Sequence, residues 1–114
     1  MSLELSDLTV NSDNSDIEFD ENKCINIDIE PTYSGNRDDE KLIISYEVDD
    51  NNNVSISNSP KTNFETDEES IEEEICFSKE GDEVLESFIL TVTAHLDSDE
   101  EFKIARYVLV SIYV

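Results

Sequence analysis

Glycine, proline, tryptophan and basic residues are all scarce in this sequence. Its 114 residues include two glycines, two prolines, no tryptophan and seven lysines and arginines. With only Gly35 and Gly81, the chain cannot build the glycine-rich loops that bind phosphates or dinucleotides. It also lacks the run of roughly 20 apolar residues that a membrane-spanning helix requires. We therefore expect neither a nucleotide-binding enzyme of these types nor a helical membrane protein.

Residues that catalyse reactions are also few. The only histidine, His95, falls on the polar side of an apolar alternation beside Thr93, with no second metal ligand at a suitable spacing. No serine lies in a Gly-x-Ser-x-Gly or Ser-x-x-Lys motif. A catalytic pair of carboxylates would need a pocket, for which a domain of this size has little room. We predict a protein that is not an enzyme, with no catalytic residue, cofactor or metal ligand.

Calcium binding is the alternative that the many carboxylates suggest. The segment Asp49, Asn51, Asn53 begins like an EF-hand loop, but Val54 stands where glycine is required and Pro60 where a bidentate glutamate is required. A looser site remains open, with Asp13 and Asp16 near Asp97 and Asp99, if the loops of a β-sandwich gather at one end.

Acidic side chains dominate what is present. Thirty aspartates and glutamates give a net charge of -23. A surface of that charge repels nucleic acids and anionic membranes, so we expect it to bind neither directly. The opening Met1-Ser2-Leu3-Glu4 has no basic stretch followed by an apolar one, as a signal peptide would, which predicts a cytoplasmic protein.

Apolar residues alternate with polar ones in four segments, as in strands with one buried face. These segments are centred on Ile25 to Ile29, Leu42 to Val48, Phe88 to Leu96 and Phe102 to Val114. The last is apolar on both sides, which predicts burial of both faces, Tyr107 and Leu109 on one and Val108 and Val110 on the other. Weaker strands are predicted at residues 3–10, with a bulge between Leu5 and Leu8, and at residues 17–19 and 54–56.

Residues 66–77 fit two structures. Thr66 and Glu69 form a helix capping box, and Ile71 and Ile75 have helical spacing. A strand would place Ile71, Ile75 and Phe77 on one face, with Glu73 as a misfit, and the surrounding β-pattern favours it. The chain is thus predicted to be one acidic all-β domain, residues 1–114. Its fold would be an antiparallel, immunoglobulin-like sandwich of about seven short strands, with one short helix near residues 66–77 as the alternative.

Cys24 and Cys76 are the only cysteines. Each lies on the polar side of its segment, so the two could oppose one another on neighbouring strands. In a reducing cytoplasm we expect two free thiols.

The acids are concentrated in runs, whereas the basic residues are scattered singly. A charge of -23 equals that of about a dozen base pairs of DNA, whose length is comparable to a small domain. Solubility needs a net charge of only about 2 to 8. We therefore predict an inhibitor that mimics nucleic acid and occupies the DNA- or RNA-binding groove of a basic defence or DNA-processing protein. The predicted contact residues are Asp67, Glu68, Glu69, Glu72, Glu73, Glu74, Asp97, Asp99, Glu100, Glu101, Asp38, Asp39, Glu40, Asp49 and Asp50.

Small acidic proteins without catalytic motifs resemble phage or plasmid counter-defence factors of the anti-restriction and anti-CRISPR type, which implies the same kind of partner. The segments Thr91 to Ala94 and Glu101 to Ile104 resemble paired sheet strands of SecB-type export chaperones. Two alternatives are therefore an immunoglobulin-like adhesion or virion module and a SecB-like chaperone subunit, and a homodimer remains open. The charge could also be a diffuse solvated coat, as on edge strands or in halophiles.

Overall fold

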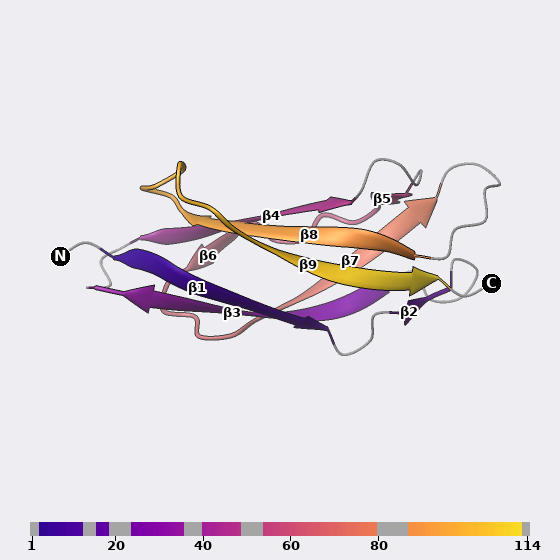
Figure 1. Ribbon diagram of the computed structural model, residues 1–114, viewed down its shortest axis with the longest axis horizontal. Coiled ribbons are helices and arrows are strands. Elements are labelled where there is room, and N and C mark those ends of the chain that lie inside the picture. Colours follow the sequence, from indigo (N-terminus) through magenta and orange to yellow (C-terminus); the bar gives the residue numbers. More distant parts are fainter. Residues whose placement is uncertain are drawn as a thin grey trace.

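The computed structural model describes residues 3–12, 16–18, 24–35, 40–48, 54–79 and 87–112, which form two β-sheets packed face to face (Figure 1). One sheet has the strand order β1 (Glu4–Ser12), β3 (Cys24–Ser34), β7 (Ile71–Lys79) and β5 (Val54–Ile56). The other has the order β2 (Asp16–Ile17), β9 (Ile104–Ile112), β8 (Ser87–Leu96), β4 (Lys41–Val48) and β6 (Asn63–Glu65).

The predicted all-β sandwich is confirmed, and the described residues form nine strands, where about seven were predicted. All strand pairs are antiparallel except β2 with β9, which is parallel over two residues. Within the described ranges, the chain has no helix long and apolar enough to cross a membrane.

The core lies between the two sheets and follows the alternation of the sequence. Ile25, Ile27 and Ile29 of β3 are fully buried, while the residues between them face outward. Phe77 of β7 and Phe88 of β8 meet edge to face across the sandwich, with ring centroids 4.8 Å apart. These contacts hold the sheets together, because aromatic and branched side chains bury the most apolar area in a β-core.

One side of the sandwich is closed where the edge strands β1 and β9 lie next to each other. The predicted bulge in β1 is confirmed, since its register with β3 shifts between Leu5 and Asp7. At the bulge, the Arg106 Nε of β9 donates a 2.8 Å hydrogen bond to the Leu8 carbonyl, and its Nη2 bonds Asp7 at 2.9 Å. Arg106 therefore joins the two sheets by donating to a backbone carbonyl and a carboxylate of the edge strand β1.

The opposite side is covered by the segment between β5 and β6, which passes from one sheet to the other. The Ser57 amide donates to the Cys76 carbonyl of β7, and the Ile44 amide of β4 donates to the Thr62 carbonyl. The short strand β6, which the sequence did not predict, then pairs with the start of β4.

The uncertain segment 66–77 contains a strand and a turn. Residues from Ile71 onward form β7, so the favoured strand interpretation is confirmed there. Residues 66 and 67 form a turn, and the Thr66 hydroxyl donates to the Glu40 carbonyl at 3.2 Å in place of capping a helix. The helix alternative is wrong because Ile71, Ile75 and Phe77 are buried together on one strand face.

The prediction that the last strand is buried on both faces is wrong. Val108 and Val110 of β9 are buried, whereas Tyr107 is 70% exposed and Leu109 is 59% exposed. The outer face of β9 carries no second layer in the described part of the chain, so its apolar side chains face solvent.

Candidate binding surfaces

Acidic residues are distributed unequally between the two sheets. On the four-stranded sheet, Asp28 and Glu30 of β3 alternate with the buried isoleucines and so share the outer face with Glu72 and Glu74 of β7. The register places Asp28 opposite Glu72 and Asn26 opposite Glu74. The only basic residue in these four strands is Lys79, at the end of β7. This group of four carboxylates, Asp28, Glu30, Glu72 and Glu74, is called the acidic face below.

The acidic face contains only part of the predicted run. Glu72 and Glu74 point outward, but Glu73 lies on the inner side of β7, between buried Ile71 and Ile75. Asp28 and Glu30 were not among the predicted contact residues. Their positions on alternate residues of β3, opposite β7, were the signal that could have identified them.

A second group of acids lies at the end of the sandwich where β4 begins and β8 ends. The Asp97 amide donates to the Lys41 carbonyl, and Thr66 bonds the carbonyl of Glu40, so three chain segments meet there. Lys41 also pairs with Glu65. Figure 1 shows the β8–β9 turn and the start of β4 at the same end of the molecule. The predicted residues at this end are Glu40, Asp67, Glu68, Glu69, Asp97, Asp99, Glu100 and Glu101.

The remaining predicted contact residues, Asp38, Asp39, Asp49 and Asp50, lie outside the described residues, as does Asp13 of the looser calcium site. Asp16 pairs with Ser111 at the far end of β9 from the β8–β9 turn. Because β9 has nine residues, that end lies about 25 Å from the turn that holds Asp97 and Asp99. The predicted grouping of Asp16 with Asp97 and Asp99 is therefore wrong.

Glu73 occupies a partly buried polar site on the side of the sandwich that the β5–β6 segment covers. Loss of solvation raises the pKa of its carboxyl, and the negative charge of Glu68 adds to this. The Lys61 ammonium and backbone amide act in the opposite direction. Tyr46 of β4 also faces this site; burial, and then the charge of Glu73, raise the pKa of its phenol. The misfit expected at Glu73 is thus a real one, and hydrogen bonding from Lys61 partly compensates for it.

The part of the five-stranded sheet formed by β8 and β9 has the opposite character on its outer face. β8 and β9 contain no acidic residue at all. Ile89 of β8 lies opposite Leu109 of β9, and Thr91 lies opposite Tyr107. Ile89 is 41% exposed, so Ile89, Tyr107 and Leu109 form a contiguous apolar group, which is called the apolar patch below. The sequence pattern predicts that Tyr107 and Leu109 are buried, and it makes no prediction for Ile89.

The apolar patch borders an edge of the sheet. β9 pairs with β8 on one side, and on the other only Ser111 and Ile112 pair, with the two-residue strand β2. Figure 1 shows β2 beside the C-terminal end of β9, and β1 runs along the rest of that edge. His95 is on the same outer face, where its ring Nδ1 lies 2.8 Å from the Leu96 carbonyl oxygen.

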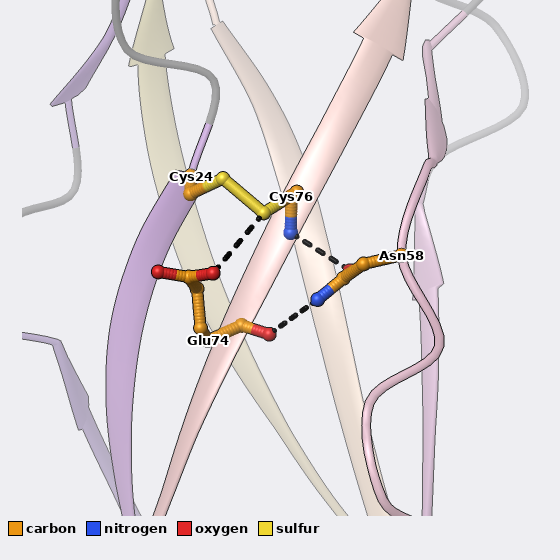
Figure 2. The surroundings of a disulfide bond; sticks show 4 residues. All are labelled: Cys24, Asn58, Glu74 and Cys76. Carbon is orange, nitrogen blue, oxygen red and sulfur yellow. Dashed lines mark hydrogen bonds between the residues drawn. A yellow bond between two sulfur atoms is a disulfide. The ribbon is translucent and has the colours of Figure 1, made fainter.

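Cys24 and Cys76 form a disulfide on the outer surface of the four-stranded sheet (Figure 2). The expectation that they oppose one another is confirmed, but the expectation of free thiols is wrong. Cys76 directs its amide to the Asn58 side chain and its carbonyl to the Ser57 amide, both away from β3. The two cysteines are therefore a non-hydrogen-bonded pair, the kind with the closer backbones, and their Cα atoms are 4.0 Å apart.

These features define an immunoglobulin-like β-sandwich with two unlike outer faces. No protein-family model matches the sequence, and no curated protein matches it. Among solved structures it is similar to the crystal structure of the periplasmic chaperone SfaE, with a TM-score of 0.55 and 13% sequence identity. The similarity covers 91% of this chain and 56% of that one, so this chain spans little more than half of the chaperone's length. The similarity supports the fold.

Proposed function

We propose that this domain is a non-catalytic module that binds an apolar segment of a partner protein over the apolar patch on β8 and β9. The observation that carries the proposal is the exposure of Tyr107, Leu109 and Ile89 side by side on the outer face of the neighbouring strands β8 and β9. Contiguous exposed apolar groups on soluble domains mark interaction sites more often than scattered ones do. The similarity to a chaperone supports a partner that is a polypeptide.

The charge distribution supports this mode of binding. The only charged residue of β9 is Arg106, whose guanidinium bonds β1. Because β1 and β2 lie along the outer edge of β9, the partner is expected to contact Tyr107 and Leu109 on the outer face and not to add a strand to the sheet.

The test is suppression of the aggregation of heat-denatured citrate synthase, followed by light scattering. Tyr107→Lys and Leu109→Lys should each abolish suppression, because they place a charge in the apolar patch. Both side chains are exposed, so the fold should be retained, as circular dichroism can verify. The matched control is Ser45→Lys, which adds the same charge to the same outer face on β4. Unchanged suppression by Tyr107→Lys and Leu109→Lys would rule the proposal out.

A second candidate function is carried by the acidic face. Asp28, Glu30, Glu72 and Glu74 lie on two paired strands that contain one basic residue between them. Such an array of carboxylates favours a basic partner. That this partner is a defence or DNA-processing protein, bound through its nucleic-acid groove, remains a prediction. The double variant Glu72→Gln/Glu74→Gln should weaken capture of such a partner from host extract, and captured protein should be released by DNA. Binding that is insensitive to salt and to this variant would reject the candidate.

A further inference from the structure

Three potential metal ligands meet on the outer surface of the four-stranded sheet. The Sγ atoms of Cys24 and Cys76 and a carboxylate oxygen of Glu74 all lie within 4.8 Å of one another. The Cys76 Sγ is 3.6 Å from the Glu74 Oε1, a contact drawn in Figure 2. The carboxylate is exposed and the sulfur atoms are partly exposed, so ions in solution can reach the group.

The backbone brings these three side chains together. Cys24 and Cys76 are directly opposite in the β3–β7 register, and Glu74 is two residues from Cys76 and therefore on the same sheet face. The Asn58 side chain fixes this part of β7 from the other side: its Oδ1 accepts from the Cys76 amide at 2.9 Å, and its Nδ2 donates to the Glu74 carbonyl at 2.7 Å. Figure 2 shows Asn58 bridging the two residues in this way.

We propose that, once the disulfide is reduced, Cys24, Cys76 and Glu74 bind one zinc ion. Two thiolates and a carboxylate are ligands that zinc accepts, and water would complete the four-coordinate shell. At Zn–S distances of about 2.3 Å, two sulfurs on one ion are at most roughly 4 Å apart in a tetrahedral site. Side chains from residues whose Cα atoms are 4.0 Å apart can meet that requirement by rotation about their Cα–Cβ bonds.

The chemistry has two steps and needs an external two-electron reductant, for example a dithiol. The dithiol supplies two electrons and two protons, the S–S bond breaks, two cysteine thiols form, and the dithiol leaves as its own cyclic disulfide. Zinc then replaces the two thiol protons, which pass to solvent, so that both sulfurs bind as thiolates. Oxidised and zinc-bound forms are therefore alternatives at the same pair of sulfurs.

The surroundings favour a cation. Asp28 and Glu72, the pair that follows Asn26 and Glu74 on the same two strands, place further negative charge on the same sheet face. Lys79, the only basic residue of the four-stranded sheet, alternates in β7 with the buried residues and not with Glu72 and Glu74 of the outer face. The local concentration of cations is raised next to such a surface. This inference does not depend on the proposed function, because the apolar patch is on the other sheet.

The test uses cobalt(II) as a spectroscopic substitute for zinc on the full chain. The protein is reduced with a phosphine, desalted without oxygen and titrated with Co²⁺. The reduced protein should develop a thiolate-to-cobalt charge-transfer band that saturates at one equivalent, and Zn²⁺ should remove it. The oxidised protein should show no band. If the reduced protein gives none either, the proposal is refuted.

Two charge-matched variants test the role of Glu74. Glu74→Gln should weaken Co²⁺ binding at least about tenfold, because even residues outside the first coordination shell are worth about 10- to 100-fold in metal affinity. Glu72→Gln removes the same charge from the same face of β7 and should change affinity far less. Equal effects of the two variants would remove Glu74 from the ligand set. Circular dichroism is recorded throughout the titration. The proposal would also be refuted if the reduced chain lost its β-sheet signal and cobalt bound without restoring that signal.

Discussion

Removal of the disulfide should destabilise the domain by a large and calculable amount. The bond joins residues 52 apart in the sequence, so it greatly restricts the unfolded chain. The chain-entropy model then gives about 4 kcal/mol for a closed loop of this size. Cys24→Ser/Cys76→Ser loses this restriction, and both side chains are only partly buried, so little core packing is lost with it.

The expected change is easily measured. For a chain of 114 residues, about 4 kcal/mol corresponds to a fall in melting temperature of roughly 15 to 20 °C. With a urea m-value of about 2 kcal/mol per molar, the unfolding midpoint should fall by about 2 M. Urea unfolding followed by circular dichroism, with the wild type measured both oxidised and reduced, provides the comparison.

The outcome that would refute this reasoning is specific. If the serine variant and the oxidised wild type unfold within about 1 kcal/mol of each other, the loop-closure argument does not apply to this chain. The reduced wild type should behave like the serine variant. Thiol labelling of protein taken directly from cells would also show whether the cysteines are paired there. A cytoplasmic location remains a prediction, and a disulfide is more typical of an oxidising compartment.

Three further predictions concern stability. Burial raises the pKa of Glu73 above its ordinary value of 4.5, so the folded state binds this proton more tightly than the unfolded state. The stability that this group contributes is therefore greatest at acidic pH and falls as the pH rises through the pKa of the folded state. Glu73→Gln should stabilise the protein at pH 7, and this gain should disappear near pH 4. Urea unfolding at the two pH values measures the difference. Phe77→Ala should cost about 3 to 5 kcal/mol in the same assay, because it removes the ring that packs on Phe88. Added salt should raise the melting temperature by screening the net charge of -23, and a flat response would show that repulsion among the acids is weak.

The strands were predictable wherever one face is buried. In β3, β4 and β8 every second residue, the one on the predicted core face, is apolar, and in the structure these residues face the core. The bulge in β1 was also evident, because the apolar spacing slips between Leu5 and Leu8. β6 was not evident: Asn63–Glu65 contains one apolar residue, Phe64, and pairs with β4 through contacts that depend on the tertiary fold.

The binding surfaces were harder to predict, because a face depends on register as well as on alternation. The run from Glu72 to Glu74 could be read as one acidic patch, but alternation sends Glu73 inward and leaves its neighbours outside. Asp28 joins them only because β3 pairs with β7 in the observed register. The apolar residues Tyr107 and Leu109 were assigned to the core because sequence alone cannot show that nothing covers the outer face of β9.

The unequal faces argue against a diffuse acidic coat. A coat that served solubility would be needed most over exposed apolar side chains, yet the ten residues of β8 and the nine of β9 contain no carboxylate. Among the described residues, acids lie on the opposite sheet and at one end of the sandwich, and on β4, in the same sheet as β8 and β9, Glu47 is exposed. The two proposed surfaces can therefore be distinguished by one variable. Binding through the apolar patch should be maintained or strengthened by moderate salt, whereas binding through the acidic face should weaken steeply.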